Sequence, residues 1–415
     1  MHLYELPLLF VLVGLVFYVV LAGADFGAGF WQLAAGRGEA GARVRDHAHD
    51  SMAAVWEANH VWLIFVLTVL WTAYPRAFGA IASTLSLPLF IAAIGIILRG
   101  AAYALRAGAS SASERRPIDT VFALSSILTP FALGTMLGAI ASRRVPVGNA
   151  AGGLFSSWTG ATSILVGVLA IANCAYLAAV FLAADAARLN ERELEDGFRR
   201  RALAAGVLAG ACAIAGLAVL HTDAHPLYSR LLHSSALAAM IVSILAGSAT
   251  LELVRRRSFA LARYSAALAV AAVIAGWGLA QNPTLLPGLS VRAAAAPHDT
   301  LVAVVVAVLA GAVILFPSLA LLFRLQLAGR LDHGSAASSH PAPGGSLLSA
   351  SAPGLLTRLA GACLLAGFGF LTIAEAGWAH ALGVFALFGF LILGFAALEF
   401  ASEHDRPLGA GSGEA

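Results

Sequence analysis

Hydrophobic and polar positions alternate along this chain in long blocks rather than residue by residue. A helix needs about 20 apolar residues to cross the hydrocarbon core of a membrane, and runs of that length recur throughout the chain. Eleven candidate spans result, at residues 6–23, 53–74, 77–98, 118–140, 161–184, 202–220, 231–253, 264–281, 301–323, 356–374 and 379–400. The pattern predicts an all-α polytopic membrane protein.

Two polar stretches interrupt the pattern near the C-terminus. Residues 331–354 are rich in Ser, Gly, Pro and His, which is typical of a flexible linker. Residues 403–415 form a polar tail. We therefore expect a nine-helix transmembrane domain at residues 1–330, then the linker, then an extra transmembrane helix pair at residues 355–402.

Composition narrows the function classes. Hydrophobic residues make up 60% of the chain and charged residues 11%, whereas a soluble domain carries about 25% charged residues. These values exclude a soluble globule and a disordered chain, and a net charge of +3 does not suit nucleic-acid binding. The three cysteines show no CxxC or CxxCH spacing, so a zinc site, an attached c-type haem and an iron–sulfur cluster are not expected.

The arginines predict the orientation in the membrane. The chain has no lysine, and all 25 basic residues are arginine. With the N-terminus outside, 20 of them fall in inner segments and only five in outer segments. The outer five are Arg76, Arg143, Arg144, Arg230 and Arg292. Because inner loops carry the basic excess, we expect the N-terminus to face outward.

Asp25 is the first polar residue that the bilayer should exclude. It follows the first apolar run and stands among Gly23, Gly27 and Gly29, so we expect it at the inner end of the first helix. The glycines would allow another helix to approach closely. Its position alone leaves two interpretations open: a carboxylate bathed by headgroup water, or a functional group inside the bundle.

Glu57 lies about one turn inside the second span. Helical spacing places Glu57 and His60 on one face, with Trp56, Asn59 and Trp62 close by. A carboxylate in a transmembrane helix costs at least ~2.5 kcal/mol on insertion scales, so this group should face the bundle interior. A purely structural polar cluster is the alternative, but we favour a proton path opening inward that joins Asp25 and Glu57.

Other polar residues carry weaker signals. Arg99 closes the third span, where it should snorkel to the interface or pair with a carboxylate. We group it with Trp56, Asn59, His60 and Trp62 as a structural polar cluster. The deepest histidines, His60 and His380, lie near opposite sides of the membrane, so they do not form a haem-ligand pair.

Several motifs together resemble subunit II of cytochrome bd quinol oxidases. They are GADFGAG at residues 23–29, VWEANHVWLI at 55–64, YPRAF at 74–78, LRGAAYALR at 98–106 and AQNP at 280–283. Their order and spacing match the family as well as their letters do. The resemblance covers about residues 1–330.

The resemblance implies a fold and an assembly. Subunit II of this family has nine helices, arranged as two four-helix bundles plus a peripheral helix. It pairs in the bacterial plasma membrane with subunit I, which carries haems b and d and the quinol-oxidising loop. The implied cofactor content of this chain is therefore none, and its other implied partners are small single-helix subunits, lipid and quinone, with no nucleic acid.

The resemblance also implies a reaction. The complex oxidises quinol, reduces dioxygen to water and takes up protons from the cytoplasm. In some members, acidic residues at the positions of Asp25 and Glu57 line a proton route, and Glu57 replaces an aspartate of some relatives. Two features depart from the family: Ala104 stands where relatives often have an acidic residue, and the final helix pair has no counterpart we can identify, although it could be a fused accessory subunit.

Two other function classes compete with this interpretation. A proton-coupled secondary transporter would use Asp25 and Glu57 to couple protons to a substrate, but it should have broken helices at matching positions of two repeats. No such pair is evident, and the polar residues gather at the inner end instead. A cytochrome that binds haem itself is disfavoured by the depths of His60 and His380.

Overall fold

The computed structural model describes residues 2–36, 38–51, 56–108, 112–233, 235–327 and 355–372, with short pieces between 378 and 393. The side chains of residues 56–58 and of a few other helix-end positions lie outside this description. The chain divides into two compact units, Met1–Leu319 and Ala320–Ala415. The first unit contains nearly all the helices of the predicted transmembrane domain.

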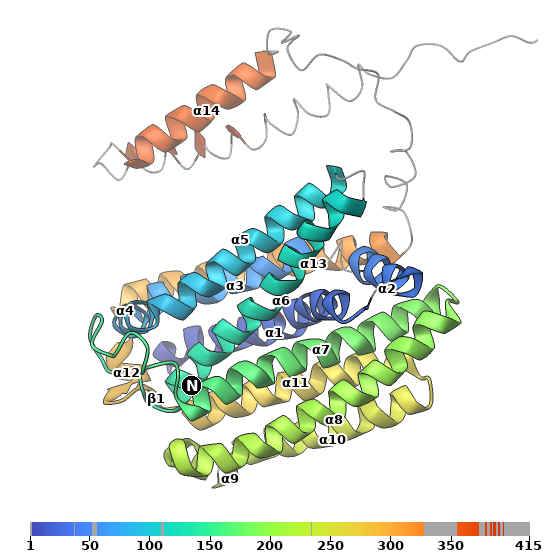
Figure 1. Cartoon of the computed structure of the whole chain (residues 1–415). Coiled ribbons are helices and arrows are strands. Elements are labelled where there is room, and N and C mark those ends of the chain that lie inside the picture. Colours follow the sequence, from blue (N-terminus) through green and yellow to red (C-terminus); the bar gives the residue numbers. More distant parts are fainter. Residues whose placement is uncertain are drawn as a thin grey trace, which may run out of the picture. The chain divides into compact units, whose positions relative to one another are not determined.

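The elements of the first unit follow one another as a series of long helices with short connections (Figure 1). They are a 3-10 turn at Leu3–Glu5, α1 (Leu6–Leu33), α2 (Glu39–Asp50), α3 (Trp56–Ala73), α4 (Pro75–Thr84), α5 (Ser86–Gly108), α6 (Ala112–Ala141), α7 (Ala161–Arg188), α8 (Arg192–Asp223), α9 (His225–His233), α10 (Ala236–Arg255), α11 (Phe259–Gln281), β1 (Thr284–Leu286), β2 (Leu289–Ser290), α12 (Val291–Ala294) and α13 (His298–Leu327). The second unit contributes α14 (Leu355–Thr372).

The predicted fold class is confirmed. Eight helices of the described part are long and apolar enough to cross a membrane, and α3 adds a shorter apolar stretch at Asn59–Ala73. These nine correspond in order to the first nine predicted spans. Helix α14 occupies the place of the tenth, and most of the eleventh lies outside the described residues. Between residues 2 and 327 the strands found are β1 and β2, a short antiparallel pair.

Two predicted helix boundaries were wrong. The first helix does not end at Gly23 but continues to Leu33. The run 77–98 is not one helix, because it breaks at Leu85 between α4 and α5. Pro88 explains the break: it has no backbone N–H to offer the carbonyl of Thr84, four residues earlier, so the helix cannot continue smoothly through that turn.

The long helices form two groups of four. Helices α1, α3, α5 and α6 pack in one group, and α7, α8, α10 and α11 pack in the other. Helices α1 and α6 join the groups by packing against α7. Helix α13 is mostly exposed and touches α1 where Phe316 meets Phe17. This is the arrangement of two bundles plus a peripheral helix that the sequence resemblance implied.

Small residues let α7 occupy the centre. A side chain at Gly27 of α1 would collide with the backbone carbonyl of Cys174, and one at Gly134 of α6 would lie 2.8 Å from the Cα atom of Gly167. Helix α7 itself buries Leu177, Val180 and a row of alanines completely. Membrane helices gain stability from such close backbone approach, because lipid gives them no hydrophobic drive to associate.

Candidate functional site

Asp25 and Arg99 form an ion pair inside the first helix group. The two side chains are 2% and 0% exposed. A guanidinium nitrogen of Arg99 donates to the Asp25 carboxylate and also to the Asp25 backbone carbonyl at 2.9 Å, while another donates to the hydroxyl of Ser126 in α6. The pair therefore ties α1, α5 and α6 together at one depth.

Aromatic rings complete the surroundings of the Arg99 side chain. Its guanidinium carbon lies 4.1 Å from the ring centre of Phe122 and 5.0 Å from that of Phe26, where the ring faces attract a cation. Gly29 leaves the necessary room, because a Cβ atom there would crowd Ser126 and lie 3.2 Å from an Arg99 nitrogen. A buried charge is tolerated only with this degree of compensation.

This geometry corrects the expected position of Asp25. The residue was expected at the end of the first helix, but α1 runs eight residues further and buries it. Arg99 was expected to close its helix, but it lies nine residues before the end of α5 and pairs with Asp25 instead of snorkelling. This burial excludes the interpretation of Asp25 as a carboxylate bathed by headgroup water. Its pairing with Arg99 lets α1 continue past the charge.

The first helix group holds further buried polar atoms. The second carboxylate oxygen of Asp25, the hydroxyls of Tyr18 and Thr129, and the side-chain oxygen of Asn59 have no hydrogen-bond partner among the described residues. Buried polar atoms are normally hydrogen-bonded, and each exception calls for an explanation. These atoms come from α1, α3 and α6 of the first helix group.

Helix α3 brings several of the predicted cluster residues against α1. Asn59 is fully buried and donates to the carbonyl of Leu21 at 3.3 Å. Trp62 stacks on Phe17 with ring centres 4.5 Å apart, and His60 is half-buried. The side chains of Trp56 and Glu57 lie outside the described residues, although the backbone places both in the first turn of α3. The proton-relay role of Glu57 stays a prediction.

A second ionic cluster was not anticipated from the sequence. Arg106 near the end of α5 reaches Asp46 of α2 at 3.0 Å and Asp119 of α6 at 3.2 Å. Asp46 and Asp119 thus provide the carboxylates that pair with Arg106, whereas Ala104 has no charged group to do so. Beside them, His49 of α2 lies against Tyr103 with ring centres 5.1 Å apart. The sequence does carry a signal for this cluster. It is the amphipathic run at Glu39–Asp50, which is polar and too short to cross a membrane.

His49 should make stability depend on pH. Burial lowers the pKa of His49 to about 4, and the nearby charge of Arg106 adds to the effect. An unfolded histidine titrates near 6.5. Between about pH 4 and 6.5 the unfolded chain therefore binds more protons, so stability rises with pH across that window and levels off above it.

Replacing His49 by glutamine should flatten this dependence. We expect the loss of stability between pH 7.5 and pH 5.5 to shrink by on the order of 1 kcal/mol, since solvent screens the half-buried ring. The apparent melting temperature of the detergent-purified protein at the two pH values measures it. His298→Gln is the control, because its ring is 76% exposed. Equal pH dependence in His49→Gln and the unaltered protein would contradict the assignment.

The family of the chain follows from comparison with known proteins. A family model described as cytochrome bd terminal oxidase subunit II matches residues 3–326. The chain belongs to the cytochrome bd oxidase subunit II family. As a member of this family with many membrane-crossing helices, it is a multi-pass membrane protein. Family membership favours the oxidase over the transporter.

Individual relatives agree with this family. The chain is 28% identical over 129 residues to "Cytochrome bd ubiquinol oxidase subunit 2" of Bacillus subtilis (strain 168), an alignment that spans 31% of this chain and only 37% of that relative. It is 24% identical over 243 residues to "Putative cytochrome bd menaquinol oxidase subunit II" of the same organism, spanning 57% of this chain and 68% of the relative. The bd oxidase structure from Geobacillus thermodenitrificans shares the fold, with a TM-score of 0.60 and 24% identity over 79% of this chain and 99% of that one.

Proposed function

We propose that this chain is the haem-free subunit of a bacterial cytochrome bd-type oxidase, which oxidises quinol and reduces dioxygen to water. The family match over residues 3–326 carries the proposal. The names of the Bacillus relatives, a ubiquinol and a menaquinol oxidase subunit, support a quinol as the electron donor. Haems b and d then belong to a partner, subunit I. Within the described residues of this chain, no three His, Cys, Asp or Glu side chains gather as a metal site.

The proposed orientation has the N-terminus outside. The 20 arginines of the inner segments, against five outside, support it through the positive-inside rule. Helix α2 lies at the opposite end of the helices from α4, α9 and α12 (Figure 1). In this orientation α2 and the Arg106 cluster face the cytoplasm.

Within the complex, this chain helps to take up protons from the cytoplasm through the region of Asp25 and Glu57. The two residues have different tasks. Arg99 holds the Asp25 carboxylate by charge-assisted hydrogen bonds, so Asp25 acts as a fixed partner of Arg99 beside the path. Glu57, in the first turn of the neighbouring helix α3, is the group that binds and releases the proton. The buried polar atoms of Tyr18, Asn59 and Thr129, on α1, α3 and α6, support a polar route through this helix group.

Co-purification tests the proposed function. An affinity tag on this chain should retrieve, from membranes, a coloured complex with a second polytopic subunit and quinol-dependent oxygen consumption. Dissociating the partner should remove the haem absorbance from the tagged chain. The proposal fails if this chain alone retains haem, or if deleting its gene leaves the oxidase activity of the membranes unchanged.

A further inference from the structure

Three aromatic rings gather where α8 gives way to α9. His221 lies in the last turn of α8, and His225 and Tyr228 lie in the first turn of α9. The ring centres of His221 and His225 are 5.6 Å apart, and those of His221 and Tyr228 are 5.0 Å apart. Tyr228 also lies 6.2 Å from His225. The three rings therefore form one cluster, which we call the histidine cluster.

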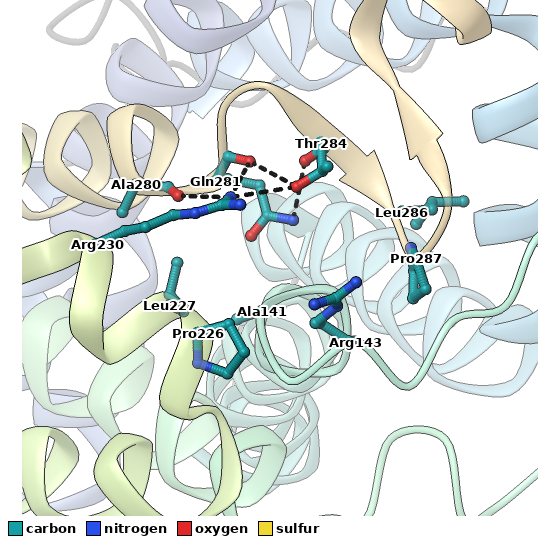
Figure 2. A pocket seen from close by; sticks show the side chains of 10 residues that line it. All are labelled: Ala141, Arg143, Pro226, Leu227, Arg230, Ala280, Gln281, Thr284, Leu286 and Pro287. Carbon is teal, nitrogen blue, oxygen red and sulfur yellow. Dashed lines mark hydrogen bonds between the residues drawn. The ribbon is translucent and has the colours of Figure 1, made fainter. Parts of the chain in front are cut away.

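A break between the two helices brings the histidines together. Ala224 separates α8 from α9 with a φ of −139° and a ψ of 47°, which are not helical angles. Pro226 favours the break, because it has no N–H to donate to the carbonyl of Thr222. On its other side α9 is packed against the protein, where Leu227 and Arg230 line a small pocket with the turn between α11 and β1 (Figure 2). The packed side of α9 thus leaves the histidine cluster at the surface.

Both histidines have ring nitrogens that can bind a ligand. His221 and His225 are exposed, and neither imidazole has an ion pair or hydrogen bond with another described residue. The neighbouring carboxylate is already engaged, since Asp223 accepts from Arg144 at 2.8 Å and from the hydroxyl and N–H of Thr162 at 2.7 and 3.1 Å. A neutral imidazole offers one nitrogen lone pair to a metal ion.

The spacing of the two imidazoles suits a tetrahedral metal ion between them. A zinc ion lies about 2.0–2.1 Å from a ligating nitrogen, and therefore roughly 3.2 Å from the centre of the ring. Two imidazoles at the tetrahedral angle then have ring centres about 5.2 Å apart, close to the 5.6 Å between His221 and His225. The right angle of an octahedral or square-planar site would bring the ring centres to about 4.5 Å. The separation therefore fits zinc best.

We propose that His221 and His225 bind a zinc ion, which joins the end of α8 to the start of α9. Water fills the other two tetrahedral positions, because no third His, Cys, Asp or Glu joins the pair in the part of the chain that the structure describes. Structural zinc sites are closed by four protein ligands, so a site with two of them holds an exchangeable ion. Cysteine spacing could not reveal this site, since both ligands are histidines. In the proposed orientation it opens to the outside.

Aromatic packing alone is the competing explanation of the cluster, since rings that meet edge to face attract each other. The variant His225→Phe separates the two explanations, because phenylalanine keeps a ring against His221 and Tyr228 but has no nitrogen to bind a metal. The complex is purified from membranes through a tag without histidine, stripped with a chelator and dialysed against a series of zinc concentrations. Atomic absorption measures the zinc bound per complex.

We expect His225→Phe and His221→Gln each to weaken the binding of one zinc ion per complex by at least about tenfold, since changes that only neighbour metal ligands already cost about 10–100-fold. Zinc should raise the melting temperature of the unaltered complex, and both variants should lose this rise. His233→Gln is the control, because this exposed histidine of α9 lies outside the cluster and bonds to the carbonyl of Ser229. The inference is overturned if His225→Phe binds zinc as the unaltered complex does, or if His233→Gln loses as much affinity.

Discussion

The substitution Glu57→Gln is expected to slow quinol-driven oxygen consumption by at least about tenfold, because an amide cannot bind and release the proton that the reaction consumes. The complex should still assemble with its usual haem absorbance, since glutamine has nearly the same shape as glutamate. An oxygen electrode with a short-chain quinol measures the rate. The haem spectrum of the same sample normalises it.

Aspartate at the same position is the matched control. Glu57→Asp keeps the carboxylate and shortens the side chain by one methylene, so a large part of the activity should remain. Proton uptake in proteoliposomes should fall together with oxygen consumption in Glu57→Gln. Full turnover of Glu57→Gln would show that protons reach the reaction by another route, without changing the family of the chain.

Breaking the Asp25–Arg99 pair should have the largest effect on stability. Arg99→Met leaves the Asp25 carboxylate buried without its counter-charge, and removing one partner of a buried pair typically costs about 3–5 kcal/mol. We expect a low yield of complex and a lower melting temperature, measured in detergent by loss of the haem spectrum. Arg292→Met is the control, because surface substitutions usually stay within about 0.5 kcal/mol.

The double variant separates structure from function. Asp25→Asn combined with Arg99→Met removes both charges, so stability should return toward that of the unaltered protein. Turnover should stay low, because the Asp25–Arg99 pair beside the proton path is gone. Full activity in a stable double variant would make the pair purely structural. An Arg99→Met complex as stable as the unaltered one would contradict the ion pair itself.

The helices of this protein could be predicted because the bilayer imposes a simple rule. Every backbone polar group in hydrocarbon must be satisfied within its own helix, so each crossing needs a long apolar run. That rule located nine helices of the described part. The rule failed at Leu85, where Pro88 breaks an apolar run into two helices. It also failed beyond Gly23, because hydropathy takes the charge of Asp25 as a helix end although α1 continues past it.

The candidate site was predictable only in its residue types. Asp25, Arg99 and Asn59 stood out as polar residues in apolar surroundings, but 74 positions separate Asp25 from Arg99. No local pattern says which side chains meet across such a distance. The role of α2 was missed for the same reason. Asp46 and His49 contact Arg106 and Tyr103 of α5 only in the folded chain.

Apolar run lengths and arginine placement, both properties of short segments in lipid and water, were enough to predict a multi-pass helical membrane protein and its expected orientation. The pairing of Asp25 with Arg99 and the ionic cluster around Arg106 emerged only once the helices were packed. The energies of these ion pairs depend on the distance between the charges and on their burial. Both are set only when segments that are distant in the sequence pack together.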